Sequence, residues 1–252
     1  MHNIKLIIAY DGTSYLGWQR VINGPSIEET LQKVLEKILQ QPILLQAASR
    51  TDAGVHASGQ VVNFLANLPL LNLYRLKGSL NRLLPKDIII IDVEEMHDSF
   101  HPTMDCIAKE YRYFICYGPT QLPQNRLYSW HCPKSLILDE IRESISALIG
   151  SYDFSAFCNQ KKLTTHKNFV RNLHKIELFD LNEKRLCISI QGNNFLYKMV
   201  RNIVGTLIYI GKGKIDRNSL SDILKSQDRK TAGVTAPAHG LFLHQISYSN
   251  KL

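Results

Sequence analysis

The 252-residue chain has no long apolar run and no regular cysteine pattern. A membrane-spanning helix needs about 20 consecutive apolar residues, and the first residues, MHNIKLIIAYDG, become acidic and turn-like after a short apolar stretch. We therefore expect no transmembrane segment and no signal peptide. The five cysteines are odd in number, widely spaced and never in CxxC form. This argues against a disulfide framework or a zinc site and favours a cytoplasmic protein with reduced thiols.

Several motifs of nucleotide and metal sites are also missing. The sequence has neither GxxxxGK[ST] nor GxGxxG, and the GKGK of residues 211 to 214 lacks the strand and helix context of either motif. His97 and His101 have the i,i+4 spacing of helical ligands, but their surroundings are turn-like. His56 follows Asp52 by four residues with no further His or Cys at metal spacing nearby. We therefore expect no metal site.

Acidic residues are the minority charge, and the basic ones are unevenly placed. Lys and Arg number 30 against 22 Asp and Glu, which gives a net charge of +8, the sign expected of a protein that meets polyphosphate. Segment 161 to 175, KKLTTHKNFVRNLHK, contains no acid, and a second basic cluster, KGKIDR, spans residues 212 to 217. Phosphate contacts need such a surface. Solvated lysines on a basic protein without a nucleic acid partner explain the composition equally well.

The hydrophobic periodicity predicts a protein of mixed α and β structure. Strands are expected near residues 4 to 10, 42 to 48, 59 to 65, 88 to 94, 110 to 117, 170 to 180, 185 to 191 and 241 to 248. Helices are expected from Ser26, near 73 to 82, near 136 to 149 and from 196 to 211. Ser26 and Glu29 form a capping box at the first of these helices. A segment with Gly and Pro after Cys116 suggests a connection, which predicts an N-terminal lobe of residues 1 to 117 and a C-terminal lobe of residues 118 to 252.

The helix expected over residues 196 to 211 has two chemically different faces. Its apolar stripe consists of Met199, Val200, Ile203, Val204, Leu207 and Ile208. Another face carries Lys198, Arg201, Asn202 and Gly205, which fall three and four residues apart. Because glycine costs about 1 kcal/mol relative to alanine inside a helix, Gly205 suggests that another segment approaches closely. An ordinary packing glycine among solvated charges is the alternative.

Residues 49 to 64, SRTDAGVHASGQVVNF, place a lone carboxylate in a polar loop between two apolar stretches. Such a loop usually carries function or makes a tight turn. Either Asp52 is functional, or it caps a turn in which Gly54 and Gly59 supply positive φ. For an isolated Thr-Asp-Ala-Gly, the turn is the simpler interpretation.

Five separated motifs decide between these interpretations. They are YDG at 10 to 12 with GWQ at 17 to 19, RTDAGVHA at 50 to 57, KEYRY at 109 to 113, FLYKMVRNIVG at 195 to 205, and GLFL at 240 to 243. In content and order they resemble the tRNA pseudouridine synthase A family, and the resemblance covers almost the whole chain. Because five motifs in order are far more specific than one, Asp52 is interpreted as functional.

The resemblance implies both a fold and an activity. The implied fold is α/β with two similar lobes, each an antiparallel sheet with helices on one face, joined around a central basic cleft. The implied activity is isomerisation of uridine to pseudouridine in the anticodon stem-loop of tRNA, around positions 38 to 40. The family acts as a homodimer, and neither a cofactor nor a metal is expected. The partner implied is tRNA, with no membrane.

The resemblance also implies roles for individual residues. Asp52 corresponds to the family's catalytic nucleophile, and Arg50 to an arginine that draws the target nucleotide into the site. Tyr111 corresponds to the ring that stacks on the target base, and its hydroxyl is a candidate for proton transfer. Arg201 corresponds to the arginine that pairs with the catalytic carboxylate. An apolar residue of the GLxL motif, either Leu241 or Leu243, helps to form the floor of the pocket.

The chemistry explains why these residue types are needed. Pseudouridine formation breaks the bond from N1 to C1′, rotates the uracil and rejoins it through C5 without redox change. A carboxylate can attack C1′ or C6, or deprotonate the sugar to give a glycal, and the sequence leaves these routes open. A paired arginine would keep the carboxylate ionised, and an aromatic ring suits a base removed from its stack. The proton on C5 then needs a base, either Tyr111 or a water.

The sequence departs from the family pattern at two positions, and two other classes of function remain as alternatives. Ser49 stands where the family usually has glycine, and Thr103 stands where an arginine often follows FH. A non-catalytic RNA-binding protein of the same fold is the first alternative. An Asp-dependent phosphoester hydrolase is the second, but it would want further carboxylates and a divalent metal, and the one nearby acid in a similar loop is Asp11.

Overall fold

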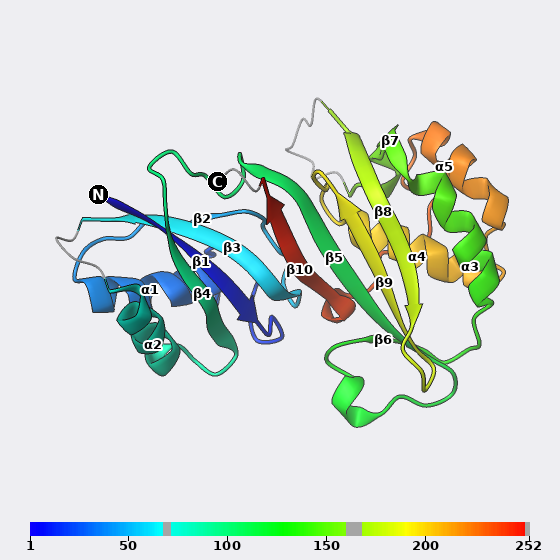
Figure 1. The fold of residues 1–252 in the computed structure, drawn as a ribbon. Coiled ribbons are helices and arrows are strands. Elements are labelled where there is room, and N and C mark those ends of the chain that lie inside the picture. Colours follow the sequence, from blue (N-terminus) through cyan, green and yellow to red (C-terminus); the bar gives the residue numbers. More distant parts are fainter. Residues whose placement is uncertain (68–71, 160–167, 250–252) are drawn as a thin grey trace. The chain divides into compact units, whose positions relative to one another are not determined.

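The computed structural model describes residues 1–67, 72–159 and 168–249, and the chain divides into two compact units (Figure 1). The first unit contains Met1–Ile107 and Phe242–Leu252, and the second contains Ala108–Leu241. The expected mixed α/β fold with two lobes is confirmed. The division differs from the expected one after residue 117, which falls at the end of a strand, and the last strand of the chain belongs to the first unit.

The first unit is a sheet with two helices on one face (Figure 1). Its strands are β1 (His2–Tyr10), β2 (Gln46–Ala47), β3 (His56–Ala66), β4 (Ile88–Met96) and β10 (Leu241–Tyr248), and its helices are α1 (Ile27–Leu39) and α2 (Leu73–Leu83). The strand order is β4-β1-β3-β10, with β2 beside β3. The pairings of β1 with β3 and β4 are antiparallel, whereas β10 pairs with β3 in parallel. The expected sheet was antiparallel, and the pairing of β3 with β10 is an exception. The long chain between these strands supplies the crossover that a parallel pair requires.

Alternation along β1 explains how this unit forms its core. Ile4, Leu6 and Ile8 are fully buried, while the residues between them are partly exposed. Burying such a side chain contributes about 1.5 to 3 kcal/mol. Helix α1 begins after Ser26, whose hydroxyl accepts a hydrogen bond from the backbone N–H of Glu29 at 3.3 Å. This confirms the cap, but the Glu29 carboxylate lies 2.8 Å from Lys33 Nζ, so the reciprocal half of the expected box is replaced by an ion pair.

The strand expected over residues 42 to 48 is limited to the two residues of β2. Ile43 and Leu45 are buried and Leu44 is exposed, so the alternating burial from which the strand was predicted is present in the structure. It arises from packing of an extended segment without a ladder at these positions. A burial pattern alone therefore overestimates the length of this strand.

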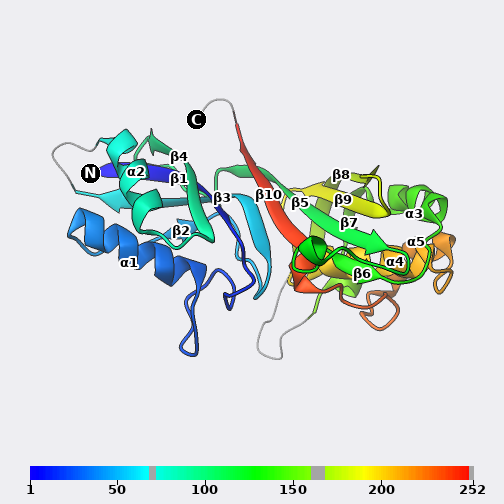
Figure 2. The ribbon, with the colours of Figure 1, turned by 90° about the horizontal axis from the view of Figure 1, so that it is seen from below.

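The second unit combines β-strands with helices α3 (Leu138–Ser144), α4 (Met199–Gly211) and α5 (Leu220–Ser226) (Figures 1 and 2). Its strands are β5 (Cys106–Tyr117), β6 (Trp130–Cys132), β7 (Gly150–Asp153), β8 (Val170–Asp180) and β9 (Arg185–Gly192). They follow the order β5-β9-β8-β7, and β6 pairs with β5 in parallel. The helix expected over 136 to 149 is α-helical in α3 and continues as a 3-10 turn over Ile145–Leu148. The short elements β6, β7 and α5 were not expected.

Helix α4 is almost entirely buried, with Arg201 and Tyr209 as its partly exposed members. It begins at Met199, later than expected, because Lys198 has a left-handed conformation with φ of 61°. A Cβ added at Gly205 would lie 1.7 Å from the backbone oxygen of Val234. The predicted close approach of another segment to this face of the helix is therefore confirmed.

This contact predicts opposite effects for one substitution at two helical glycines. Gly205→Ala should destabilise the protein by about 1 to 3 kcal/mol, because the Val234 backbone must move to admit the methyl group. Gly78→Ala in α2 is the control, since a Cβ there meets no atom within 4 Å, and alanine should stabilise by about 0.5 to 1 kcal/mol. Denaturant unfolding of both variants measures these changes. Equal effects at the two positions would contradict the prediction.

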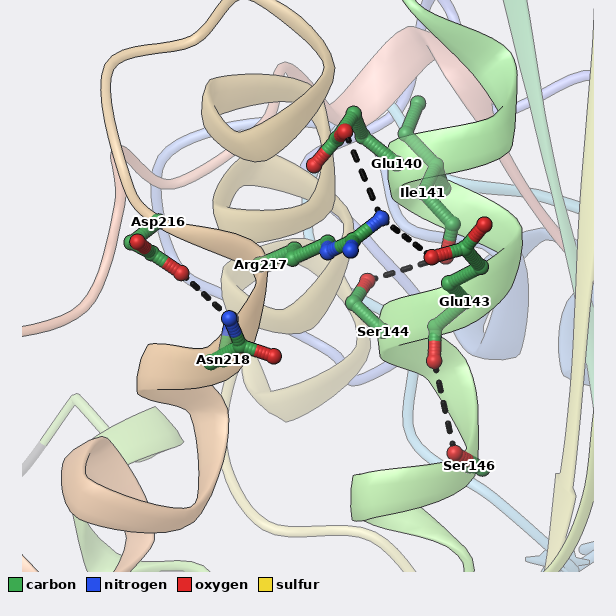
Figure 3. A network of polar contacts seen from close by, with 8 residues as sticks. All are labelled: Glu140, Ile141, Glu143, Ser144, Ser146, Asp216, Arg217 and Asn218. Atoms are coloured by element: carbon green, nitrogen blue, oxygen red, sulfur yellow. Dashed lines mark hydrogen bonds and ion pairs between the residues drawn. The ribbon is translucent and has the colours of Figure 1, made fainter.

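Helix α3 is tied to the turn that precedes α5 by Arg217 (Figure 3). Its guanidinium lies 3.5 Å from the Glu140 carboxylate and also pairs with Glu143. The Asp216 carboxylate caps the turn by accepting a hydrogen bond from the N–H of Asn218 at 2.8 Å. Because these side chains are partly exposed, each pair contributes about 0 to 1 kcal/mol.

The helices within the described ranges are too short or too polar to cross a membrane.

Candidate active site

The loop that carries Asp52 is anchored to the loop that follows β1. The N–H of Trp18 donates to the backbone oxygen of Thr51 at 3.1 Å, and the Thr51 and Tyr10 hydroxyls lie 2.8 Å apart. A turn bond of 3.1 Å runs from the N–H of Val55 to the Asp52 oxygen. The Asp52 side chain is partly exposed. The chain thus fixes the backbone on both sides of Asp52, a partly exposed residue.

Glycine allows the two loops to come this close. Gly17 has φ of 99°, and a Cβ there would lie 2.7 Å from the Thr51 oxygen. A Cβ at Gly12 would lie 2.1 Å from the oxygen of Val55. Gly12 belongs to the YDG motif and Gly17 to the GWQ motif. These motifs therefore pack directly against the RTDAGVHA motif.

Of the two glycines expected to supply positive φ in the Asp52 loop, one does so. Gly54 has φ of 74°, as expected. The expectation for Gly59 is wrong, because Gly59 lies within β3 and is not among the residues with positive φ. A Cβ there would lie 2.4 Å from the backbone oxygen of His244, so the glycine allows β10 to approach. A turn capped by Asp52 therefore accounts for Gly54 but not for Gly59.

The GLFL motif reaches the Asp52 loop through strand pairing. Phe242 pairs with His56 and Leu243 with Ala57 in the parallel ladder. The rings of His56 and Phe242 are stacked, with centroids 4.5 Å apart, and Leu243 is fully buried. His56 Nδ1 also accepts a hydrogen bond from the N–H of Gly12 at 3.1 Å. These contacts make His56 a packing residue between motifs.

Arg50 lies on an ordered backbone but has an exposed side chain. The backbone oxygen of its neighbour Ser49 accepts a hydrogen bond from Gln60 Nε2 at 2.6 Å. A fixed backbone with an extended cation suits contact with an anionic ligand. Arg50, Asp52 and Leu243 therefore lie in one unit, around one loop and the ladder beside it.

Tyr111 and Arg201 belong to the second unit. Tyr111 lies on β5 opposite Ile190, is 6% exposed and packs edge-to-face on Phe195 at 5.1 Å. Lys109 lies two residues away on the same face of β5, and its Nζ donates to Asn194 Oδ1 at 3.1 Å. A short loop thus supports both the tyrosine ring and a buried cation beside it.

Arg201 is held at the start of α4 by the chain that leads into β10. Its Nε donates to the Ala236 oxygen at 2.7 Å, and the Ala236 N–H donates to the Arg201 oxygen at 3.0 Å. The next residue, Pro237, accepts a hydrogen bond from the Tyr113 hydroxyl at 2.8 Å. Burial raises the pKa of Tyr113 well above its usual value, and burial also lowers the pKa of His239. This segment therefore connects helix α4 with strand β5.

The sequence motifs name candidate site residues but assign no role to the groups that contact them. Tyr10 was quoted in a motif without a function, and its hydroxyl contacts Thr51 beside Asp52. A usable signal existed, since a buried tyrosine at the end of a strand generally needs a partner for its hydroxyl. Asn202 was placed on the polar face of α4, whereas the structure buries it completely.

The structure describes the second of the two basic clusters, but only part of the first. Residues 161 to 167 of the first cluster lie outside the described residues. In the second cluster, Lys212 Nζ lies 5.3 Å from the centre of the Trp130 ring, and Arg217 pairs with acids of α3. The described cations of this cluster therefore have intramolecular contacts, as expected of structural charges.

Comparison with known proteins gives one consistent result. A family model described as tRNA pseudouridine synthase matches residues 6–104 and 145–249. The chain is 60% identical over 248 residues to tRNA pseudouridine synthase A 2 of Protochlamydia amoebophila, covering 98% of this chain and 95% of that protein. It is 41% identical to tRNA pseudouridine synthase A of a Thermoanaerobacter species, covering 98% and 100%, and 40% identical to that of Chlamydia felis, covering 98% and 92%.

Proposed function

The chain belongs to the tRNA pseudouridine synthase family, and from this premise we propose that it converts uridine to pseudouridine in tRNA with Asp52 as the essential catalytic residue. The observation that supports the role of Asp52 most directly is its setting. A partly exposed carboxylate stands on a loop whose neighbouring backbone is held by Trp18, Tyr10 and two closely packed glycines. Fixed geometry of this kind is what a nucleophile or base requires.

In the proposed reaction, Asp52 acts in the first step. Both nucleophilic attack on the nucleotide and removal of a sugar proton use its carboxylate, and either route releases the uracil from C1′ for rotation. Arg50, exposed beside it, binds the RNA backbone and draws the target nucleotide out of its stack. Leu243 contributes to the floor of the pocket that receives the base.

Tyr111 and Arg201 complete the proposed set. The Tyr111 ring, held edge-on by Phe195, offers a face for the uracil, and its hydroxyl removes the proton from C5 after the new bond forms. Arg201, whose Nε donates to the Ala236 oxygen, is the proposed partner of the Asp52 carboxylate. We further propose that the substrate uridines lie around positions 38 to 40 of the anticodon stem-loop, and that the protein acts as a cytoplasmic homodimer.

Tritium release from tRNA labelled at uridine C5 tests this proposal. Formation of the bond from C5 to C1′ displaces the hydrogen on C5 to water, so wild-type protein should release tritium with excess EDTA present. A hydrolase that depends on a divalent metal would release none under these conditions. Tight tRNA binding without tritium release would overturn the proposal in favour of a non-catalytic RNA-binding protein.

Labelling limited to single uridines separates the parts of the proposal. Release from tRNA labelled at positions 38 to 40, and not from tRNA labelled elsewhere, supports the proposed substrate position. Release from other positions would leave the activity standing and contradict the position. Light scattering of the free protein measures whether it is a dimer.

A further inference from the structure

The segment from Arg229 to Ala236 is bound unusually closely along helix α4. The N–H of Gly233 donates to the Thr206 hydroxyl at 2.9 Å, and a Cβ at Gly233 would lie 2.7 Å from the Thr206 Cα. At the preceding residue of the helix, Gly205 leaves room for the Val234 oxygen. The segment is therefore seated on α4 by glycines on both partners, and it ends at the residue that holds Arg201.

A buried amide lies at the centre of this contact. Asn202 is fully buried, and its Nδ2 donates to the Phe157 oxygen and to Asn159 Oδ1, each at 2.7 Å. Its Oδ1 accepts hydrogen bonds from Thr235 Oγ1 at 2.6 Å and from Arg229 Nη2 at 3.0 Å. Both donors and the acceptor of the amide are thus used, which fixes its orientation.

The guanidinium of Arg229 contacts neutral oxygens. Besides Asn202, it donates to Asn159 Oδ1 at 3.3 Å, to Thr235 Oγ1 at 3.1 Å and to the Ala232 oxygen at 3.4 Å. Burial lowers the pKa of Arg229, although a guanidinium stays protonated in proteins. Among the described residues its hydrogen-bond partners are neutral, and desolvating a cation with neutral partners alone is unfavourable. Charge pairing therefore does not explain this contact. Its effect is geometric, because one rigid fork joins α4, the Asn159 loop and Thr235.

We propose that Arg229 is a positioning residue for Arg201. It holds Thr235 against Asn202, and the next residue, Ala236, holds Arg201 Nε with its carbonyl oxygen. The inference rests on the proposed role of Arg201 in pseudouridine formation. Because a displacement of about 1 Å near a reacting group can lower a rate by about 100-fold, loosening this segment should slow the reaction without removing any group that touches the substrate.

Two variants and one matched control test the inference. Arg229→Met removes the fork, and Thr235→Val removes the hydroxyl that bonds Asn202 while keeping the size of the side chain. Thr231→Val is the control, since its hydroxyl donates to the Asp228 oxygen at 2.8 Å and lies 2.9 Å from the Ser226 hydroxyl, so its hydrogen bonds are to residues outside α4. We expect both test variants to lower the single-turnover rate of pseudouridine formation by roughly 10- to 100-fold, with unchanged tRNA dissociation constants. The control should keep the wild-type rate.

A double-mutant cycle distinguishes a positioning role of Arg229 from a merely structural one, because it measures whether the losses of rate in the Arg229 and Arg201 variants are additive. If Arg229 acts through Arg201, Arg229→Met should cause little further loss of rate in an Arg201→Met background. Additive losses, or a wild-type rate in folded Arg229→Met and Thr235→Val proteins, would overturn the inference. The wild-type protein in the same assay tests the proposed function separately, because absence of pseudouridine there contradicts the function and not the positioning role alone.

Discussion

Asp52→Asn is expected to abolish pseudouridine formation while leaving the fold and the tRNA affinity intact. Asparagine keeps the size of the side chain and most of its hydrogen bonding but cannot act as a nucleophile or a base. The loop is held in part by the Asp52 backbone oxygen and by the hydroxyls of Thr51 and Tyr10, and asparagine leaves these bonds in place. The loss should therefore be confined to the chemical step, with single-turnover conversion undetectable.

Three measurements on this variant separate a catalytic from a turn-capping role. They are the melting temperature, the tRNA dissociation constant and the single-turnover conversion. Asp105→Asn is the control, because its carboxylate caps a turn by accepting the N–H of His101 at 2.8 Å, and asparagine serves nearly as well in that position. If Asp52→Asn binds tRNA and still forms substantial pseudouridine, Asp52 is not the catalytic residue.

Tyr111→Phe is expected to lower turnover by about two to four orders of magnitude, the size of a general acid-base contribution. Phenylalanine keeps the ring that packs edge-to-face on Phe195, so tRNA binding and stability should change little. Only the hydroxyl is lost. The expected defect is thus in the step that removes the proton from C5, after the uracil has been released and rotated.

Tritium release and product formation measured together locate this defect. Tyr152→Phe is the control, since Tyr152 lies on β7 of the same unit with its side chain 42% exposed. Turnover close to wild type in Tyr111→Phe would assign proton removal to a water and leave the ring as a stacking surface only.

The sequence predicted the local elements well because burial has a local period. The alternation in β1 and the helical spacing after Ser26 are set by neighbours a few residues away. The pairing of Ala57 with Leu243 has no such local signal, and neither the parallel placement of β10 nor the purpose of Gly59 could be read from periodicity. Gly205 was informative because its cost inside a helix requires a cause.

For the candidate site, the motifs predict which residues act but not which groups hold them in place. Asp52 and Arg201 stand in recognisable motifs, whereas Arg229 lies in a loop whose composition resembles many others. Its contacts with Asn202 and Thr235 depend on how that loop lies on α4. Such contacts follow from tertiary packing, which no spacing rule encodes.

The placement of β10 has a consequence for biosynthesis. The second unit interrupts the first, so a ribosome completes residues 108 to 241 before it delivers the strand that pairs with β3. Until then β3 lacks its parallel partner strand at His56 and Ala57, and His56, four residues from Asp52, lacks the ring of Phe242. Long-range closure of this kind is slow and exposes an edge that can pair wrongly. The Asp52 loop is therefore among the last parts of the protein to mature.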